Sequence, residues 1–502
     1  MTATMHRGAV ASPRAWRAVL RHRAVVPVAI GLLGFTISMI GIVIPSIWYD
    51  EAATIISATR SWPQLWAEIH TVDAVHALYY SLMHVVFDVV GYSPLTLRMP
   101  SAIAMGFAAA LVVVLGRQLQ RERLAWIAGL VFCVIPRVTW MGTEGRSYAI
   151  TAALAVLLTV VLVRALRGGS RRWWVLYTAL AVLSCVLFLY LALVVVAHGI
   201  TVVALLAMRK PDARRNAVRW AVAAATAALV ALPFAREVIA QSGQVAWIHA
   251  IGPDTVRQVL RTQWFYGTGF AIVAWLLIVI GVASMIRRDR RLLAVIVPAL
   301  VLPTVALIVI SELASPIYQP RYITMCTPFV ALAIAAGIDA FRWRLVPVVA
   351  LVALAALALP QITYQRTPES KENASWEQVA QLVAHERQLD PPGTSTAIIY
   401  GTVQRHPGAT ARVIAYSYPA AFEGTIDVTL RTPAAETGRL WETHAPLAAS
   451  TDRLEGADVA YLITSKARDL RPETTAVMRA NGWHVVDEWD FTSVHVLKYE
   501  RD

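Results

Sequence analysis

Hydrophobic residues come in long runs over the first two thirds of the chain and give way to a mixed pattern after about residue 361. A transmembrane helix needs about 20 mostly apolar residues, and eleven stretches approach this length. The pattern therefore predicts a mainly α-helical, polytopic membrane domain over residues 25–361. The expected spans are 25–47, 95–116, 124–141, 148–165, 173–189, 191–208, 217–235, 269–286, 292–311, 322–341 and 345–361.

Short arginine-rich segments between these runs predict the topology. Positive residues favour the cytoplasmic side of a membrane, and all six segments fall on one side of the eleven spans. This places the N-terminal tail, residues 1–24, in the cytoplasm and the C-terminus outside. If residues 74–90 were counted as a span, the later arginine-rich segments would fall on the outer side. We therefore expect an interfacial helix there, within an outer loop over 48–94. The six segments are 1–24, 117–123, 164–172, 209–219, 287–291 and 342–344.

The remaining residues, 362–502, alternate between helical and extended patterns. Such alternation predicts a small extracytoplasmic α/β domain. This part contains no G-x-G-x-x-G or P-loop motif, so the sequence predicts no nucleotide site there. The expected elements are helices at 375–388 and 472–480 and strands at 396–400, 411–416, 458–463, 482–488 and 493–498.

Composition narrows the class of protein. A chain with 57% hydrophobic and 15% charged residues is not an ordinary soluble enzyme, in which about 25% of residues are charged. The net charge of +13 could suggest nucleic acid as a partner. Because about half of the 45 Lys and Arg residues lie in the six predicted cytoplasmic segments, we attribute the charge to topology. Membrane lipids are expected partners and nucleic acid is not.

Two adjacent acids follow the first predicted span, in the sequence Trp48-Tyr49-Asp50-Glu51-Ala52. Carboxylates beside a bilayer are costly unless they have partners or a function. One interpretation makes Asp50 a general base that takes the proton of an acceptor hydroxyl during sugar transfer, with Glu51 as a helper or metal ligand. The alternative is that both acids cap the following helix.

Two further motifs bring arginines to the predicted outer face. The first holds Glu144, Arg146 and Tyr148 at the outer connection between the predicted spans 124–141 and 148–165. The second holds Arg321 and Tyr322 at the start of a span. Arginine suits phosphate because its planar group makes bidentate, charge-assisted hydrogen bonds. The alternative is an ordinary Arg146–Glu144 ion pair beside an interfacial tyrosine.

A weaker pattern indicates a metal. His70, Asp73 and His76 are three residues apart, so on a helix they follow roughly one face and could bind a divalent ion such as Mg or Mn. The alternative is that these residues only anchor the segment at the lipid headgroups. The outer loop at 236–268 mixes aromatic and basic residues, which suits sugars and phosphates but is also common in interfacial loops.

Taken together, these motifs resemble those of the GT-C superfamily of polytopic glycosyltransferases. The similarity is to the branch related to protein O-mannosyltransferases and the aminoarabinose transferase of lipid A, and it extends over residues 25–361. The motifs that carry it, in chain order, are Trp48-Tyr49-Asp50-Glu51-Ala52, His76-Ala77-Leu78-Tyr79-Tyr80, Leu97-Arg98-Met99-Pro100-Ser101, Glu144-Gly145-Arg146-Ser147-Tyr148 and Pro320-Arg321-Tyr322.

The resemblance implies an inverting transfer of a sugar from a polyprenyl-phosphate donor to an envelope glycan, glycolipid or protein on the outer face of the cell membrane. Mannose is the favoured sugar and arabinofuranose the alternative. By position, Asp50 is implied as the catalytic base and Arg146 and Arg321 as ligands of the donor phosphate. Relatives usually carry prolines after the position of His76, and this sequence lacks them, which leaves its role open. The other implied substrate contacts are Glu144, Tyr148, His76, Tyr79 and Tyr322.

Two functions from other classes remain. A lipid or glycan transporter should place ionisable groups near the bilayer midplane and often contains inverted repeats. Here the acids and arginines gather at one face, and the sequence contains no evident repeat. A non-catalytic scaffold that presents its outer domain is the other alternative.

Overall fold

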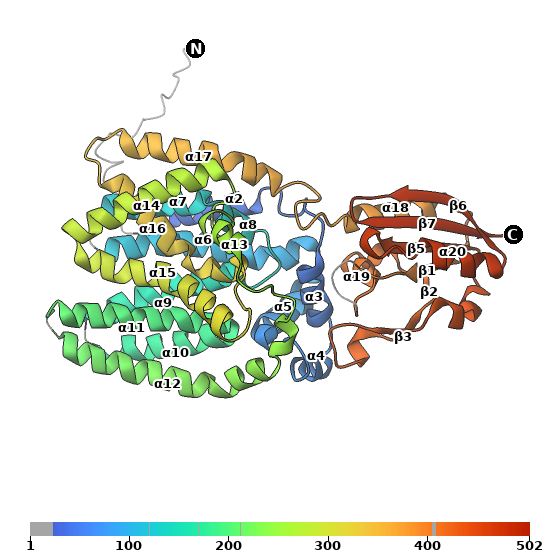
Figure 1. The fold of residues 1–502 in the computed structure, drawn as a ribbon, viewed down its shortest axis with the longest axis horizontal. Coiled ribbons are helices and arrows are strands. Elements are labelled where there is room, and N and C mark those ends of the chain that lie inside the picture. The colour runs from blue at the N-terminus through green and yellow to red at the C-terminus, as the bar shows by residue number, and fades with distance from the viewer. Residues whose placement is uncertain (1–23, 120, 169, 211, 404–407) are drawn as a thin grey trace, which may run out of the picture.

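A computed structural model describes residues 24–119, 121–168, 170–210, 212–403 and 408–502. The predicted cytoplasmic tail lies almost wholly outside these residues. The described chain forms a bundle of long helices, with an α/β domain at one end of the bundle (Figure 1). The described chain therefore consists of a helical part followed by a part that contains a small sheet.

The membrane domain is helical throughout, with helices in all eleven predicted spans. Among the described residues, eight helical segments are long and apolar enough to cross a membrane. The helices are α2 (Val25–Met39), α3 (Tyr49–Ala58), α4 (Trp62–Ile69), η1 (Ala74–His76), α5 (Ala77–Val90), α6 (Pro94–Gln118), α7 (Glu122–Val134), α8 (Pro136–Met141), α9 (Tyr148–Gly168), α10 (Arg171–Leu187), η2 (Leu189–Leu191), α11 (Ala192–Ala207), α12 (Ala213–Ala240), η3 (Ser242–Val245), α13 (Pro253–Arg257), η4 (Gln258–Thr262), α14 (Thr268–Arg288), α15 (Arg290–Leu313), η5 (Pro320–Cys326), α16 (Thr327–Asp339) and α17 (Val346–Tyr364).

Three of the predicted spans are shorter or broken. Helices α2 and α10 have 15 and 17 residues, and the span at 124–141 is divided into α7 and α8. The break falls at Ile135, which is extended. It precedes Pro136, and a proline disfavours helical geometry in the residue before it. The chain is therefore a multi-pass protein, with eight rather than eleven helices of spanning length in its described part.

The predicted cytoplasmic loops meet at one end of the bundle. Arg121 in the loop after α6 lies 3.4 Å from the Asp289 carboxylate between α14 and α15. Arg123 donates a hydrogen bond of 3.4 Å to the carbonyl of Trp343, between α16 and α17. These connections lie at the end away from the C-terminal domain (Figure 1). Three of the arginine-rich segments therefore share one side, as the sequence predicts.

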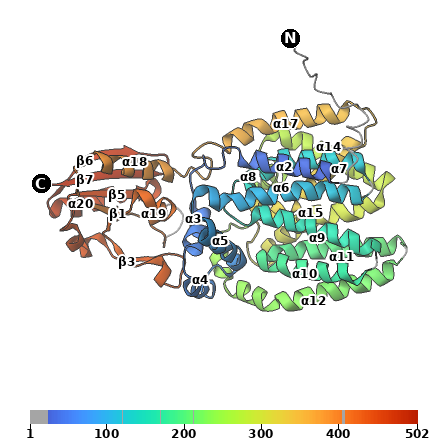
Figure 2. The ribbon, with the colours of Figure 1, turned by 180° about the vertical axis from the view of Figure 1, so that it is seen from behind.

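The outer loop forms short helices at the opposite end. Helices α3, α4 and α5 lie between the bundle and the C-terminal domain, as both opposed views show (Figures 1 and 2). Helix α6, which follows them, packs against α2, α7 and α9. The segment at 74–90 is thus at the outer end of the bundle, which fits the expected interfacial helix.

The C-terminal domain is a five-stranded mixed sheet with helices. Strands β2, β1 and β5 are parallel, and β7 and β6 continue the sheet in antiparallel fashion, in the order β2-β1-β5-β7-β6. A separate antiparallel pair joins β3 to β4. The elements are α18 (Trp376–Leu389), β1 (Thr396–Tyr400), α19 (Arg412–Ser417), β2 (Ile426–Asp427), β3 (Leu430–Thr432), β4 (Thr443–His444), β5 (Val459–Ser465), α20 (Arg471–Ala480), β6 (Trp483–Asp490) and β7 (Val494–Arg501).

One predicted strand is wrong. Residues 411–416 were expected to be extended, but α19 occupies this stretch. A short apolar run does not by itself distinguish a strand from a buried helical turn. Within this helix the buried Arg412 reaches the Asp427 carboxylate with two hydrogen bonds, of 2.5 and 2.7 Å. This tertiary contact is not visible in the local pattern.

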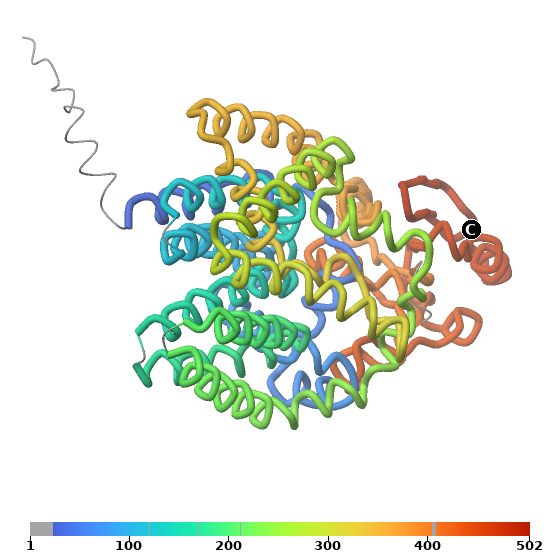
Figure 3. The backbone as a smooth tube through the Cα atoms, turned by 60° about the vertical axis from the view of Figure 1, so that its left-hand side comes forward, coloured from blue at the N-terminus to red at the C-terminus, as the bar shows by residue number. Residues whose placement is uncertain are grey.

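The C-terminal domain is attached directly to the outer loop. Helix α17 lies along the edge of the bundle (Figure 3), and residues 365–375 lead from it to α18. The Ile47 amide donates to the Tyr418 hydroxyl at 2.9 Å, and the Tyr92 hydroxyl donates to the Ser417 carbonyl at 2.7 Å. The domain is therefore fixed beside the start of α3.

Candidate active site

Asp50 lies in the first turn of α3, and Trp48, the residue directly before this helix, has an extended backbone. A carboxylate in this turn is stabilised by the positive end of the helix dipole. The Asp50 side chain is 16% exposed, and its Oδ2 atom lies 3.4 Å from Nη2 of Arg321. Asp50 is therefore a partly open acid beside a predicted phosphate ligand.

Arg146 links the same helix to the outer loop. Its Nη1 atom donates to the Asp50 carbonyl at 3.1 Å and to the Tyr80 hydroxyl at 3.2 Å, while Nη2 lies 2.7 Å from Nε2 of His76. Because arginine only donates, His76 accepts through Nε2 and carries its proton on Nδ1. Burial, together with Arg146 and Arg321, lowers the pKa of His76 well below its usual value. The His76 ring is thus neutral: Nε2 accepts from Arg146, and Nδ1–H remains as a donor.

Several polar atoms around these arginines are buried and lack a hydrogen-bond partner within the described chain. Buried polar groups are nearly always paired. An unpaired group beside a cationic pair therefore indicates a site for a polar ligand. Most of these atoms are donors, which suits an anion such as phosphate. They are Nε of Arg146, Nε of Arg321, Nδ1 of His76, the Tyr79 hydroxyl and Oγ of Ser147.

Aromatic rings surround Arg321. Its guanidinium lies 5.7 Å from the Trp48 ring centroid, 5.1 Å from that of Trp247 and 5.8 Å from that of Tyr322. Such rings stabilise a cation. Trp247 comes from the outer loop at 236–268, so this loop does contact the predicted site. Tyr148, fully buried at the start of α9, interacts electrostatically with both Arg321 and Asp50.

Glu51 has a different environment from its neighbour Asp50. Its carboxylate accepts hydrogen bonds from Nε and Nη2 of Arg98, at 2.8 and 2.6 Å, and from the Gly145 amide at 2.8 Å. Lys371 donates a further bond of 2.7 Å. The side chain is fully buried. Glu51 is therefore enclosed among protein donors, three of them on Oε1 and one on Oε2, and its predicted role as catalytic helper or metal ligand stays a prediction.

Glu144 is likewise enclosed. It accepts a 3.0 Å hydrogen bond from the Trp48 indole and lies 3.0 Å from the Lys371 ammonium, with no exposed side-chain surface. Its partners are thus Trp48 and Lys371 and not Arg146, and its predicted place among the substrate contacts stays a prediction. We call Glu51, Arg98, Glu144 and Lys371 the buried charge cluster.

Lys371 enters this cluster from the segment between α17 and α18. Besides the two carboxylates, its ammonium donates to the Thr143 carbonyl at 2.6 Å. The next residues, Glu372 and Asn373, have φ values of +54° and +57°. Side chains other than glycine adopt this region at a cost, and surrounding contacts must hold them there. Lys371 thus holds this segment against Glu51, Glu144 and Thr143.

The two acids of the cluster have opposite pKa shifts. Burial alone would raise the pKa of Glu51, but Arg98 and Lys371 outweigh it and lower the value to about 2. Burial raises the pKa of Glu144 to about 7, with Lys371 opposing the rise and Glu51 adding to it. Near neutral pH, Glu51 is therefore ionised and Glu144 is near its midpoint.

Glu144 should make the folded state weaken as pH rises from about 4.5 to about 7. In this window the folded chain keeps a proton that the unfolded chain has lost, so the free energy of unfolding falls with pH. Glu144→Gln should remove that part of the slope. Thermal unfolding of the detergent-solubilised protein over this range measures it. Parallel pH profiles for the wild type and Glu144→Gln would contradict the shift.

The three predicted metal ligands do not come together as one group in the described part of the chain. His70 is exposed and its Nδ1 lies 2.8 Å from the Trp66 carbonyl, whereas Asp73 accepts a 2.8 Å bond from the Tyr80 hydroxyl. His76 faces the Arg146 guanidinium, which repels a metal cation. Within the described ranges, no group of three or more His, Cys, Asp and Glu side chains could hold a metal ion.

The sequence interpretation gave no role to Arg98 or Lys371, and it included Trp247 only as one member of the outer loop at 236–268 that suits sugars and phosphates. Arg98 was part of a motif of the resemblance, but nothing local indicated its buried partner. Lys371 had one available signal: it is one of four lysines among the chain's 45 basic residues. Lysine and arginine are not interchangeable, so a rare lysine in an arginine-rich chain is a reasonable candidate for a specific role.

No protein-family model and no curated protein matches the sequence. Solved structures do match the fold. ArnT from Cupriavidus metallidurans, bound to undecaprenyl phosphate, has a TM-score of 0.59 at 12% identity and covers 97% of this chain and 98% of its own. The oligosaccharyltransferase AglB from Archaeoglobus fulgidus, in complex with an inhibitory peptide and a dolichol-phosphate, has a TM-score of 0.50 at 12% identity over 90% of this chain and 70% of its own.

These likenesses show the fold. ArnT matches over almost the full length, so the similarity includes the C-terminal domain as well as the membrane domain. The chain therefore shares its fold with ArnT over nearly its whole length.

Proposed function

We propose that the protein is a membrane glycosyltransferase that uses a polyprenyl-phosphate sugar on the extracytoplasmic face. The observation that carries this proposal is the pairing of a partly open acid, Asp50, with two arginines whose buried Nε atoms lack partners in the described chain. ArnT and AglB, which share the fold, were solved with undecaprenyl phosphate and dolichol-phosphate respectively. Their ligands support a lipid-linked phosphate donor here.

In the proposed reaction, an acceptor hydroxyl attacks the anomeric carbon of the donor sugar. Its oxygen forms the new glycosidic bond while the bond from that carbon to the phosphate oxygen breaks, with inversion. Asp50 takes the hydroxyl proton as general base. Arg146 and Arg321 stabilise the charge that develops on the departing polyprenyl phosphate.

Mannose is the sugar we favour and arabinofuranose the alternative, with an acceptor in the cell envelope. The test uses the full chain in proteoliposomes, with radiolabelled polyprenyl-phosphate mannose or arabinofuranose and an envelope fraction as acceptor. Transfer of label from lipid to acceptor is the expected result. Failure of transfer with both donors, while the protein remains folded, would contradict the proposal.

The two arginines should be needed for donor binding. Arg146→Ala and Arg321→Ala should each weaken the binding of polyprenyl phosphate by about tenfold or more, because a charge-assisted contact to phosphate is worth about 1.5–3 kcal/mol. Binding to the detergent-solubilised protein, followed by microscale thermophoresis, measures this. Arg257→Ala is the matched control, since Arg257 is exposed on the outer loop and pairs only with Asp254 among described carboxylates. Unchanged affinity in both site variants would remove the phosphate role.

A further inference from the structure

Two adjacent tyrosines near the start of α5 have hydroxyl groups in different environments. Both side chains are fully buried. The Tyr79 hydroxyl lacks a hydrogen-bond partner within the described chain. The Tyr80 hydroxyl instead donates to Oδ2 of Asp73 at 2.8 Å and accepts from Nη1 of Arg146 at 3.2 Å. Tyr80 therefore links an acid to one of the two arginines of the proposed site.

The directions of these two hydrogen bonds follow from the groups involved. An arginine only donates hydrogen bonds and a carboxylate only accepts them, so the single phenolic hydrogen of Tyr80 points at Asp73. The phenolic oxygen is then left to accept from Arg146. Hydrogen bonds that follow one another in a chain strengthen each other, so the bond to Asp73 makes Tyr80 a better acceptor. We call Asp73, Tyr80 and Arg146 the acid–phenol–arginine chain.

This chain of contacts affects the direction in which Arg146 faces the site. A guanidinium group is planar and rigid, so fixing its two terminal nitrogens also fixes the direction of its Nε–H. Nη1 is held by the Tyr80 hydroxyl and the Asp50 carbonyl, and Nη2 lies 2.7 Å from Nε2 of His76. Nε is buried and lacks a partner in the described chain. The contact with Tyr80 therefore helps to set the direction of an unpaired donor.

Asp73 is itself held in an unusual backbone conformation. Its φ angle is +60°, in the left-handed region that residues other than glycine keep only where surrounding contacts hold them. Those contacts come from the loop after α12. Oε1 of Gln244 accepts from the Asp73 amide at 3.1 Å, and Oε1 of Gln241 accepts from the Ala74 amide at 2.9 Å. Nε2 of Gln241 also donates to the Ile69 carbonyl at 2.9 Å. The turn that carries Asp73 is thus held on both sides of this residue.

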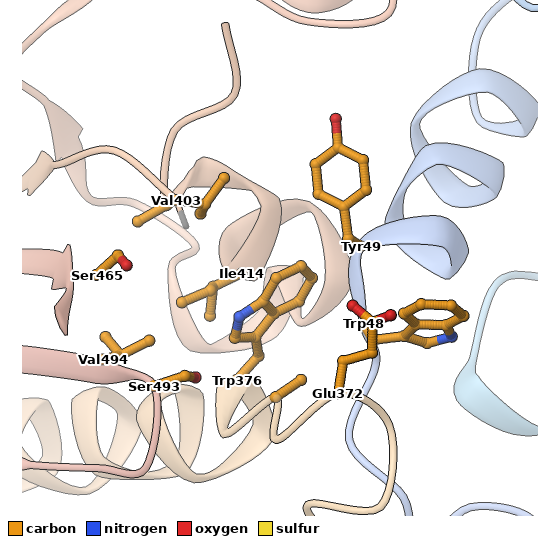
Figure 4. Close-up of a pocket in the computed structure, with 11 residues that line it drawn as sticks. Trp48, Tyr49, Glu372, Trp376, Val403, Ile414, Ser465, Ser493 and Val494 are labelled. Atoms are coloured by element: carbon orange, nitrogen blue, oxygen red, sulfur yellow. The ribbon is translucent and has the colours of Figure 1, made fainter. Parts of the chain in front are cut away.

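The start of α3 meets two different parts of the protein. Trp48 and Tyr49 line a pocket together with Trp376 and other residues of the C-terminal domain (Figure 4). Asp50, the next residue, meets the acid–phenol–arginine chain through its carbonyl oxygen, which accepts from Arg146 at 3.1 Å. This chain therefore reaches the same helical turn that carries the proposed base.

We propose that Tyr80 and Asp73 are positioning residues for the donor phosphate, and that they hold Arg146 with its unpaired Nε–H directed at that phosphate. This inference rests on the proposed function and adds two residues to its donor site. Tyr80 acts through Arg146, and Asp73 acts through Tyr80. An arginine without this support keeps its charge but loses its fixed direction, so donor binding should weaken without disappearing.

The first test removes the hydroxyl group of Tyr80. Tyr80→Phe keeps the ring, whose centroid lies 5.9 Å from the Arg146 guanidinium. Affinity of the solubilised full chain for polyprenyl phosphate should fall by about three- to tenfold, the effect of losing one hydrogen bond. Tyr499→Phe is the matched control and should bind as the wild type does. Tyr499 is also fully buried, but it lies in β7, with its hydroxyl oxygen 2.8 Å from that of Thr475.

A double variant shows whether Tyr80 acts through Arg146. In the Arg146→Ala background, Tyr80→Phe should have little further effect on the affinity for polyprenyl phosphate, because the group that it positions is already absent. A loss of the same size in both backgrounds would show that Tyr80 supports the fold in general, and it would overturn the proposal.

Two substitutions of Asp73 separate its hydrogen bond from its backbone conformation. Glycine and asparagine both adopt the left-handed region readily, but only asparagine retains an oxygen that can accept from Tyr80. Asp73→Gly should therefore weaken polyprenyl-phosphate binding about as much as Tyr80→Phe does, and Asp73→Asn should retain most of the affinity. Equal affinity in these two variants would overturn the role of Asp73.

A variant outside the acid–phenol–arginine chain covers the case in which the Asp73 variants do not fold. Gln244→Ala removes the acceptor of the Asp73 amide and leaves the Asp73, Tyr80 and Arg146 side chains in place. It should weaken polyprenyl-phosphate binding in the same direction as Tyr80→Phe. Unchanged affinity in Gln244→Ala would then count against the role of Asp73.

The outcomes for this inference differ from those for the proposed function. If the wild type does not bind polyprenyl phosphate, both are contradicted. If the wild type binds it and Tyr80→Phe binds it equally well, only the positioning role is overturned. Once transfer is established in proteoliposomes, Tyr80→Phe should lower kcat/KM for the donor at least as much as it weakens binding, since Arg146 also stabilises the departing phosphate. An unchanged kcat/KM would overturn the positioning role and leave the transferase proposal intact.

Discussion

Asp50→Asn is expected to lower the rate of sugar transfer by about 10²–10⁴-fold, the contribution usual for a positioned general base. The substitution preserves the shape of the side chain beside Arg321 and removes its ability to accept a proton. Asp50 is the residue for this role because its carboxylate is partly open, whereas that of Glu51 is fully enclosed. Initial rates in proteoliposomes measure the effect.

Two controls make this result specific. Polyprenyl-phosphate affinity should remain in Asp50→Asn, since the proposed phosphate ligands are unchanged. Asp88→Asn should retain full activity, because the Asp88 carboxylate is 71% exposed on α5. Retention of wild-type transfer in Asp50→Asn would exclude Asp50 as the base.

Lys371→Met is expected to cause the largest loss of stability among the variants considered. The lysine lies within 3.0 Å of two buried carboxylates, and removing one partner of a buried ion pair typically costs about 3–5 kcal/mol. The variant should unfold at a clearly lower temperature and lose sugar transfer, because Glu51 and Glu144 hold α3 and the edge that carries Arg146. Lys466→Met is the matched control, as Lys466 pairs with the exposed Asp490.

The double variant Lys371→Met/Glu144→Gln distinguishes charge balance from simple loss of packing. It removes one positive and one negative group and leaves Glu51 paired with Arg98 at 2.6 Å. We expect it to recover part of the stability and activity that Lys371→Met loses. A double variant no more stable than the single one would show that Lys371 acts through packing alone.

Much of the fold could be predicted because it depends on local pattern. Apolar runs gave the positions of the membrane helices, and arginine placement gave the side on which 117–123 and 342–344 meet. Helix ends were less predictable, as the break before Pro136 shows. Residues 411–416 were predicted as a strand but form a helix. In this helix Arg412 pairs with Asp427, a tertiary contact that the local sequence does not reveal.

The sequence indicated which residues lie near the site, but it did not indicate which of the two adjacent acids, Asp50 or Glu51, is enclosed. Asp50 and Glu51 are adjacent, and on a helix of 3.6 residues per turn neighbouring side chains point in different directions. Only the packing of α3 decides which acid is enclosed. Lys371 is 320 positions from Glu51, so no sequence window joins them. The residues of the metal pattern at 70–76 do not gather into one group in the described chain, and the Arg146 guanidinium lies beside His76.

The insertion of Lys371 beneath the site has a consequence for protein engineering. Although the membrane helices end at Tyr364, residues 365–375 belong structurally with the catalytic end of the bundle. A chimera that exchanged the C-terminal domain at residue 362 would discard the counter-ion of Glu51 and Glu144. A junction at Trp376, where α18 begins, would keep the charges balanced and exchange the C-terminal domain from its first helix onward.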